Sequence, residues 1–461
     1  MSCALDTCRR LQRGRSVGIR QISPGTRIPR PRYMEGAVTV NSRIPGFKDS
    51  SVEQRRSVVS ERTGVAVADL DVLDPARGLD TEHADHMIEN VIGVLGIPVG
   101  IATNFRINGR DYLVPMATEE PSVVAAASNA ARMARERGGF FTSGTGPVMQ
   151  AQIQLLDLPD PEAARLRILE HSSAVVDLAN EQDPTLVRFG GGARDLHVRL
   201  VPTRTGTHVV THLVVDVRDA MGANAVNTMA EAIAPRLAEI AGGRPLLRIL
   251  TNMADRRIVR ARAVFDRDLL GGQQVVDDIV HASALAEADP YRAATHNKGI
   301  MNGITAAVLA SGNDTRAVEA GCHSHAVGPD GRYTALSHFE KTADGHLSGT
   351  LEVPMAVGLV GGATKVHPVA QSAIKILGVT TATELAEVVV AVGLAQNLGA
   401  CRALAAEGIQ RGHMSLHART VAVTAGASTA ELDSVVAQLI QDKNIRVEHA
   451  EKVLAGLRSR S

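Results

Sequence analysis

The pattern of apolar and polar positions changes along the chain and divides it into regions of different texture. After an N-terminal leader, apolar residues recur mainly at helical spacing, and a stretch in which strand-like and helical segments alternate comes next. Ala- and Gly-rich helical segments then return. This pattern predicts an α+β fold in which a small α+β domain is inserted into a large, mainly helical domain. The predicted boundaries are 1–40 for the leader, 41–144 and 253–410 for the large domain, 145–252 for the small domain, and 411–461 for a C-terminal helical unit.

The first 40 residues show neither a helical nor a strand period. They carry eight arginines against only Asp6 and Glu35, with prolines interspersed. This composition predicts an unstructured leader, or a true start of translation further along, for example at Met34. An organelle transit peptide is a third reading, but three prolines within residues 23–32 would interrupt the amphipathic helix that such a peptide needs.

The overall charge gives no reason to expect a nucleic-acid or membrane partner. Lys plus Arg and Asp plus Glu both total 49, and the chain has no Trp and 2% aromatic residues. The most apolar long stretch, 387–406, is interrupted by Gln396, Asn397 and Arg402, which argues against a membrane span. We therefore expect a soluble, cytoplasmic protein with neither a nucleic-acid nor a membrane partner.

The cysteines do not suggest a metal site or a disulfide framework. Cys3, Cys8, Cys322 and Cys401 show no CxxC spacing, and the first two lie in the leader. We predict no bound metal.

Two adjacent acids, Glu119 and Glu120, stand directly before an Ala-rich stretch. Pro121 reads as the first helical residue, and Gly138-Gly139 read as the end of the helix, so one acid is expected at or beside the N-cap. An anion there stabilises a helix by roughly 0.3–1 kcal/mol, so a structural role is one reading. A catalytic carboxylate is the other.

A loop of small residues, Asp219-Ala-Met-Gly-Ala-Asn224, lies between a predicted strand at 208–217 and a predicted helix from about residue 224. Small side chains let a ligand approach the backbone, and a helix N-terminus offers N–H donors to an anion such as a pyrophosphate. The alternative is a simple turn with Asp219 as a cap. Neither a GxGxxG nor a GxxxxGK[ST] motif occurs, and Gly190-Gly191-Gly192 indicates only a turn.

Lys298 and Asn302 are four residues apart and face the same way if the segment is helical. A lysine among small apolar residues can be partly desolvated and polarise a carbonyl oxygen, although most lysines are simply solvated. Asp314 follows in a loop, so it can meet Lys298 only through the fold.

His413 and His417 stand at i and i+4, which could be a metal pair. The segment lacks the Glu of an HExxH site, so a hydrolytic metal centre is a remote alternative. A proton donor on a mobile terminal flap suits His413 better.

Several longer motifs occur together and in a fixed order: ENVIG (89–93), PMATEEPSVVAAAS (115–128), DAMGANAVNTMAEA (219–232), YRAATHNKGIMNG (291–303), GND (312–314) and GHMSLHAR (412–419). From about residue 42 onward the chain resembles hydroxymethylglutaryl-CoA (HMG-CoA) reductase, in particular the soluble bacterial class II enzymes. The resemblance implies a non-Rossmann dinucleotide domain at 145–252, a C-terminal flap at 411–461, and an active site formed between two subunits of a homodimer, or of an assembly of dimers, with ENVIG at the dimer contact.

The resemblance also implies the reaction, reduction of HMG-CoA to mevalonate and CoA with two equivalents of reduced nicotinamide cofactor. Each hydride delivery creates an alkoxide, so the site needs a cation and proton donors. By the family pattern Lys298 is that cation and Glu120 the catalytic acid. Asp314 orders this pair, and His413 protonates the departing thiolate of CoA. The spacing of residues alone does not choose Glu120 over Glu119, or His413 over His417.

The remaining implied contacts concern substrate and cofactor. The residues matched to substrate binding are Ser122, Arg292, Asn302, Gln396 and, for the CoA phosphates, Lys48; those matched to the dinucleotide are Asp219, Gly222, Asn224 and Asn227. Asp183 stands where some class II enzymes carry an acid that binds the adenosine ribose 2′-OH, although it could also be a turn acid before Pro184. An acid there favours NAD(H) over NADP(H) and suggests mevalonate degradation. The alternatives are an NADPH-dependent enzyme of isoprenoid synthesis and a catalytically silent paralogue.

Overall fold

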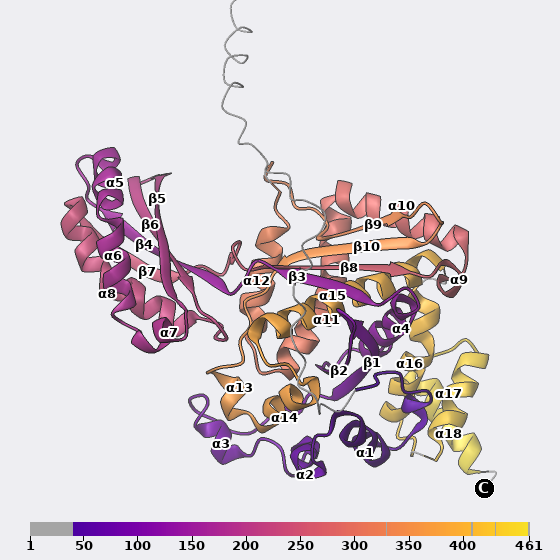
Figure 1. Cartoon of the computed structure of the whole chain (residues 1–461). Helices are drawn as coiled ribbons and strands as arrows, with labels where there is room; N and C mark the ends of the chain where they lie inside the picture. The colour runs from indigo at the N-terminus through magenta and orange to yellow at the C-terminus, as the bar shows by residue number, and fades with distance from the viewer. Residues whose placement is uncertain (1–39, 329, 407–408, 429, 460–461) are drawn as a thin grey trace, which may run out of the picture. The chain divides into compact units, whose positions relative to one another are not determined.

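The computed structural model describes residues 40–328, 330–406, 409–428 and 430–459, and for residues 363 and 409–416 it describes the backbone alone. Residues 1–39, with Cys3 and Cys8, lie outside this range, so what was predicted for the leader stays a prediction. Helices and two β-sheets make up the described part, which confirms the α+β class (Figure 1).

The larger sheet has six strands in the order β2-β1-β3-β8-β10-β9. β1 and β2 form a hairpin, and its turn residues Asn108 and Gly109 have φ of 49° and 85°, as a type I′ turn requires. β3 joins β1 in parallel, whereas the other neighbours pair antiparallel. The strands are β1 (Val99–Ile107), β2 (Arg110–Ala117), β3 (Phe140–Gly144), β8 (Ile258–Phe265), β9 (Ser337–Lys341) and β10 (Leu347–Pro354).

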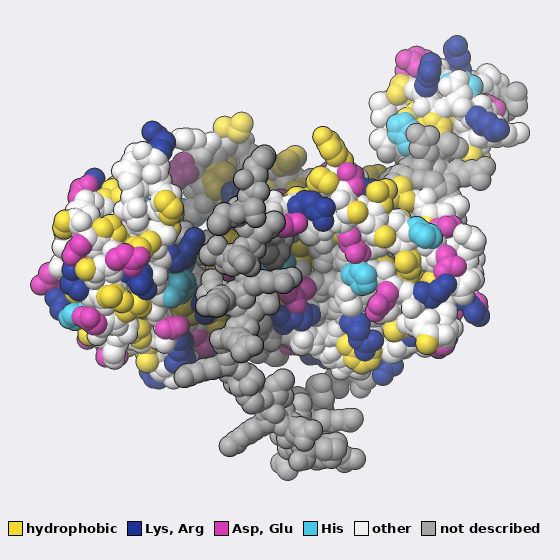
Figure 2. Space-filling model, turned by 90° about the horizontal axis from the view of Figure 1, so that it is seen from above, with side chains coloured by type: hydrophobic (Ala, Val, Ile, Leu, Met, Phe, Trp, Pro, Cys, Tyr) yellow, Lys and Arg dark blue, Asp and Glu magenta, His cyan; other side chains and the backbone are white. Residues whose placement is uncertain are grey.

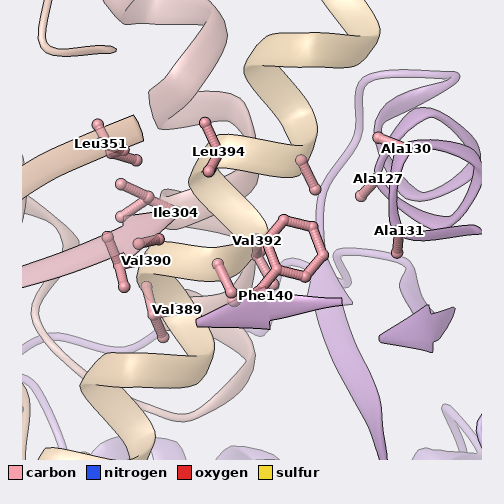
Figure 3. Close-up of a cluster of buried hydrophobic side chains, with 14 of the residues drawn as sticks. Ala127, Ala130, Ala131, Phe140, Ile304, Leu351, Val389, Val390, Val392 and Leu394 are labelled. Carbon is pink, nitrogen blue, oxygen red and sulfur yellow. The ribbon is translucent and has the colours of Figure 1, made fainter. Parts of the chain in front are cut away.

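Helix α15 (Ala382–Ala406) runs through the core beside this sheet. It contacts α4 (Val123–Arg135), α10 (Gln273–Ala288) and α11 (Pro290–Ala310), as well as β3, β8 and β10. Figure 3 shows valines and Leu394 of α15 close to Phe140 of the sheet and Ile304 of α11. Because its apolar residues face neighbours on most sides, the helix packs against both α11, which carries Lys298, and α4, which follows Glu120 in the chain.

An 18-residue window of α15 has a mean hydropathy of 1.5, and the length and composition of the helix would allow it to cross a membrane, although Gln396, Asn397 and Arg402 had argued against a span. Within the fold, however, 67% of that apolar window is buried. Such burial is that of a core helix.

Short helices complete the larger part. Ser51 caps α1 with a capping box, and the side chain of Asp80 caps α3. The elements are η1 (Phe47–Asp49), α1 (Val52–Thr63), α2 (Val67–Leu70), η2 (Asp71–Leu73), α3 (Thr81–Asp85), α9 (Arg267–Leu270), α12 (Thr315–His325), α13 (Ala363–Val366) and α14 (Pro368–Leu377).

The smaller sheet is antiparallel throughout, with strand order β5-β6-β4-β7 and its own buried core. An antiparallel sheet cannot be a Rossmann fold, which needs parallel strands. Its elements lie within the predicted small domain, although the domain boundaries themselves remain a prediction. They are β4 (Val148–Leu156), α5 (Pro161–Glu170), α6 (Ser172–Asn180), α7 (Pro184–Arg188), β5 (Gly192–Thr203), β6 (Gly206–Asp216), α8 (Ala223–Ala241) and β7 (Arg244–Leu250).

The C-terminal region consists of α16 (Ile409–Thr424), α17 (Leu432–Gln441) and α18 (Val447–Arg458). Apolar residues of the three helices form a separate small core that includes Ala418, Val435 and Leu454. This region is therefore helical, and α16 ends at Thr424, whereas its role as a separate unit stays a prediction.

Candidate active site

The segment that carries the two acids is a turn, and the prediction of a helix starting at Pro121 was wrong. α4 begins at Val123, and its N-cap is Ser122, which has φ 74° and makes no side-chain capping bond. Left-handed backbone at a non-glycine residue is rare and often marks a functional site. Neither acid caps the helix. The turn is fixed instead by the Glu120 N–H, which donates to Oγ1 of Thr118 at 3.1 Å.

Glu120 meets two residues of α11. Nζ of Lys298 donates to Oε2 of Glu120 at 2.9 Å, and Nδ2 of Asn302 donates to Oε1 at 3.3 Å. Lys298 and Asn302 lie one turn apart on the same helix face, as their spacing predicted. The Lys298 and Glu120 side chains remain 60% and 37% exposed, so the ion pair is open to a ligand. Glu119 is exposed and takes no part.

A buried amide lies beside this cluster. Gln396 of α15 is 5% exposed, and its Oε1 has no hydrogen-bond partner among the described residues. α11 approaches it closely, because a Cβ added to Gly303 would lie 2.7 Å from Cβ of Gln396. An unsatisfied buried acceptor costs about 1–3 kcal/mol, a cost that a bound hydroxyl group would remove. The site therefore fits a ligand with a hydroxyl donor.

A cavity of about 300 Å³ opens next to Ser122, between α4 and the C-terminal half of α15. Its walls are mostly small side chains, with Asn129 and Arg402 as the polar contributors. A larger cavity of about 690 Å³ lies over β3, β8 and β10 and is lined by none of the predicted site residues. The predicted site residues therefore point to the smaller cavity, which Ser122 lines, and not to the larger one.

Asp314 does not join the pair directly. It is the N-cap of α12, and its Oδ1 accepts from the backbone N–H groups of Arg316 and Ala317. Burial raises the pKa of Asp314, but the hydrogen bonds from Arg316 and Ala317 outweigh it, so the net pKa is lowered. Among the described residues no hydrogen bond links Asp314 to Glu120 or Lys298, and its ordering role stays a prediction.

His413 and His417, which the sequence predicts on a flap, lie on α16, but the His413 side chain falls outside the described part of the chain. His417 is exposed. Within the described ranges no group of three or more His, Cys, Asp or Glu residues could hold a metal ion.

Two cations expected at the substrate are free of ion pairs within the described ranges. Arg292, on the first turns of α11, is half-buried, and its backbone N–H donates to Asp289. Lys48 is exposed in η1. Both charges therefore remain open to an anionic ligand.

Hydrogen bonds from α15 and from Arg257 hold the DAMGAN loop in place. Asp219 accepts the N–H of Ala382 at 2.8 Å through Oδ1, so it caps α15 and not α8. Arg257, 3% exposed, donates to the carbonyl oxygens of Ala220 and Met221. Burial lowers the pKa of Arg257 to about 10, so it stays protonated at neutral pH. Nothing in the sequence around Arg257 had indicated this role.

The start of α8 fits an anion. Its N-cap is Gly222, with φ 108° and no side-chain capping bond, and a Cβ there would lie 2.7 Å from Val217. The first N–H groups of a 19-residue helix are thus left without a side-chain acceptor. Asn224 is exposed at this point, whereas Oδ1 of Asn227 already accepts the N–H of Leu250. A dinucleotide pyrophosphate matches these donors.

Asp183 is the N-cap of α7, and its Oδ1 accepts the N–H of Leu186 at 2.8 Å. The structural reading of this residue is therefore correct. Its Oδ2 has no partner among the described residues, so a second role is compatible with the cap.

Residues 51–418 match the family model described as hydroxymethylglutaryl-coenzyme A reductase. The chain belongs to the HMG-CoA reductase family. The enzyme of Archaeoglobus fulgidus is 54% identical over 94% of this chain and 99% of that protein. A solved HMG-CoA reductase of Streptococcus pneumoniae is 39% identical over 90% of this chain and 99% of its own, with a TM-score of 0.77.

A second HMG-CoA reductase structure from Streptococcus pneumoniae is described as class II and bound to NADPH. It shares 38% identity with this chain over 89% of it and 100% of the solved chain, with a TM-score of 0.75. These matches confirm the resemblance to class II HMG-CoA reductases and imply a nicotinamide dinucleotide as cofactor.

Proposed function

We propose that this HMG-CoA reductase interconverts HMG-CoA with mevalonate and CoA using NAD(H), and that it serves mevalonate degradation in the cytoplasm. The observation that carries the chemical part is the contact of Lys298 and Asn302 with Glu120. This contact brings a cation, an amide donor and a carboxyl group together at a place that solvent reaches. Carbonyl reduction requires a cation and a proton donor beside the oxygen.

Lys298 is the electrophile in this proposal. Its ammonium group, 60% exposed, lies where a carbonyl oxygen could replace the solvent around it. Positive charge held beside that oxygen stabilises the alkoxide that forms on hydride addition. The dinucleotide supplies the hydride when bound.

Glu120 is the acid that delivers a proton to the oxygen. Its carboxyl group is fixed by Lys298 and Asn302 within hydrogen-bond reach of the oxygen that Lys298 polarises. Asp314 orders this pair through the fold, and His413 on α16 protonates the thiolate of CoA. Both roles rest on the family motifs GND and GHMSLHAR.

The substrate is held by its acid and hydroxyl groups. Arg292 pairs with the free carboxylate of the hydroxymethylglutaryl group. Ser122 and Asn302 bind the polar groups of the same part of the substrate. Gln396 Oε1 accepts from the hydroxyl group, which would satisfy its buried lone pairs. Lys48 contacts the CoA phosphates.

The cofactor binds at the DAMGAN loop of the domain at 145–252. Gly222 and Asn224 lie at the start of α8. Asp219 ties the loop to α15, and Asn227 ties the first turns of α8 to the end of β7. The unpartnered Oδ2 of Asp183 accepts from the ribose 2′-OH and would repel a 2′-phosphate, which favours NAD(H). An NADPH-dependent enzyme of isoprenoid synthesis is the second candidate, because a class II relative is described as bound to NADPH.

One assay separates these candidates: purified protein with HMG-CoA and NADH or NADPH, and with mevalonate, CoA and NAD⁺ or NADP⁺. We expect kcat/KM to favour NAD(H) in both directions, and Asp183→Ala to reduce that preference. A wild-type preference for NADPH would refute the cofactor assignment, and no turnover with either cofactor would indicate a silent paralogue.

The quaternary structure is proposed to be a homodimer or an assembly of dimers. The segment from Ile88 to Pro98 has no regular structure and exposes several apolar side chains before β1 begins. It contains ENVIG, and its exposed fractions include 65% at Ile88, 102% at Ile92 and 87% at Leu95. A second subunit would cover such a surface.

The C-terminal helices 411–461 are proposed as the flap, and residues 41–144 with 253–410 as the HMG-CoA-binding domain. No nucleic acid or membrane is expected as a partner. On the face shown in Figure 2, basic and acidic side chains are interspersed over the described surface, which offers no continuous basic patch on that face.

A further inference from the structure

Arg194 of β5 and Arg218, which follows β6, converge at one end of the smaller sheet. The Nη2 atoms of both guanidinium groups donate to the carbonyl oxygen of Gly190. They also lie 3.8 Å and 3.3 Å, respectively, from Oδ2 of Asp216. Two cations are therefore held side by side around one carboxylate.

The turn that supplies this carbonyl oxygen leaves no room for side chains. Gly190 and Gly192 have φ of 80° and 104°. A Cβ on Gly191 would lie 2.5 Å from Cδ1 of Leu186 and 2.8 Å from the carbonyl oxygen of Asp216. The glycine run thus packs the end of α7 tightly against the end of β6, and it fixes the oxygen on which the arginines meet.

The charge at this point is not balanced. The side chains of Arg194 and Arg218 are 49% and 44% exposed, whereas Asp216 is 16% exposed. Like charges at this separation repel, and one carboxylate compensates only one of the two guanidinium groups. The exposed N–H groups that remain have the fork geometry that phosphate oxygens fit.

The pair lies among the elements of the proposed cofactor site. Arg218 directly precedes Asp219 of the DAMGAN loop, has φ 51°, and is pinned by its N–H to Oδ1 of Asp216 at 3.1 Å. On the other side, α7 is capped by Asp183 and leads into Gly190. Figure 1 shows α7 at one end of the four-stranded sheet.

We propose that Arg194 and Arg218 bind a phosphate group of the nicotinamide dinucleotide. The proposal rests on the reductase function proposed above and adds a cationic contact that the family motifs do not include. The phosphate is either the pyrophosphate, present in NAD(H) and NADP(H) alike, or the 2′-phosphate of NADP(H). Each guanidinium keeps donors for it while it holds Gly190.

The test uses the full chain and cofactor fragments, so it does not depend on turnover. Isothermal titration calorimetry would measure Kd for ADP-ribose and for 2′-phospho-ADP-ribose with wild type, Arg194→Gln and Arg218→Gln. We expect Kd to rise about tenfold in each variant, as loss of a charged hydrogen bond to phosphate implies. Arg199→Gln is the matched control, because Arg199 is an exposed arginine of the same strand β5.

An equal rise in Kd for both ligands would show that the arginines bind the pyrophosphate. A rise confined to 2′-phospho-ADP-ribose assigns the 2′-phosphate and overturns the preference for NAD(H). Unchanged Kd values in both variants, with unfolding midpoints like the wild type, overturn the proposal; if Arg218→Gln does not fold, Arg194→Gln decides alone. Oxidation of NADH and of NADPH with HMG-CoA by the wild type is measured separately, and absence of turnover with both cofactors would refute the reductase function whatever the arginines bind.

Discussion

The carboxyl group of Glu120 is positioned by residues far apart in the sequence. Ser122 turns the backbone with a positive φ, Thr118 takes the Glu120 N–H, and α11 brings Lys298 and Asn302 to its two oxygens. Because these contacts come from a turn and a helix face, Glu119 next to it points to solvent. Adjacent acids of the same chemistry are thereby given different environments.

Glu120→Gln should lower kcat about 10²- to 10⁴-fold, since the amide keeps the size of the side chain but cannot deliver a proton. The unfolding midpoint should stay near the wild-type value. Steady-state kinetics of HMG-CoA reduction check this, with Glu119→Gln as the control that should resemble the wild type. Near-normal kcat in Glu120→Gln would remove the residue from the chemistry.

The sequence predicted some features of these residues and missed others. The spacing of Lys298 and Asn302 correctly predicted a shared helix face, whereas the choice of Glu120 needed the family motif. The helix start was misplaced because the rule that puts proline first in a helix cannot detect the left-handed backbone of Ser122. Asp314 caps α12 through N–H groups two and three residues further on, a local contact that an Asp before a helix start could have indicated. The hold of Arg257 on the DAMGAN loop depends on tertiary contacts, and no local signal showed it.

At the scale of elements, the crossing of α11 and α15 sets the site. Gly303 is the point of closest approach, where an added Cβ would lie 2.7 Å from Cβ of Gln396 and 3.0 Å from the carbonyl oxygen of Val392. Gly299, one turn earlier, leaves more room, with Cβ of Ala400 the nearest atom at 3.7 Å. Periodicity predicted these helices, but the contact between them could not be read from either one alone.

Gly303→Ala should destabilise the fold by about 1–3 kcal/mol, because the helices must separate to admit the methyl group. It should also raise KM for HMG-CoA, since Gln396 moves with α15. Gly299→Ala is the control: the methyl group fits, and helix propensity favours Ala by up to ~1 kcal/mol. Urea unfolding and KM measurements compare the two, and equal stability of both variants would contradict this account of the crossing.

At the scale of the whole molecule, the apolar segment before β1 is unexplained by the single chain. Its large side chains, Ile88, Ile92 and Leu95 among them, are exposed on the single chain. Pattern analysis alone gave these residues no role, because hydrophobic periodicity reports burial within a chain and not between chains. The ENVIG motif was the only sequence signal.

Leu95→Asp should shift the protein from dimer to monomer and lower its specific activity, because a charge in a buried interface is strongly unfavourable. Light scattering after size-exclusion chromatography gives the mass, and the reductase assay gives the activity. Val67→Asp, at a position 58% exposed in α2, is the control and should leave both unchanged. A Leu95→Asp dimer with full activity would move the interface elsewhere.

Most of the elements that cover α15 are synthesised before it. A free segment of this length and hydropathy could be taken for a membrane span or could aggregate. The strands β1, β3 and β8 and the helices α4, α10 and α11, which cover α15 in the fold, all precede it in the chain. Ribosomes make the N-terminal part first, so most of the surfaces that shelter this helix already exist when it emerges.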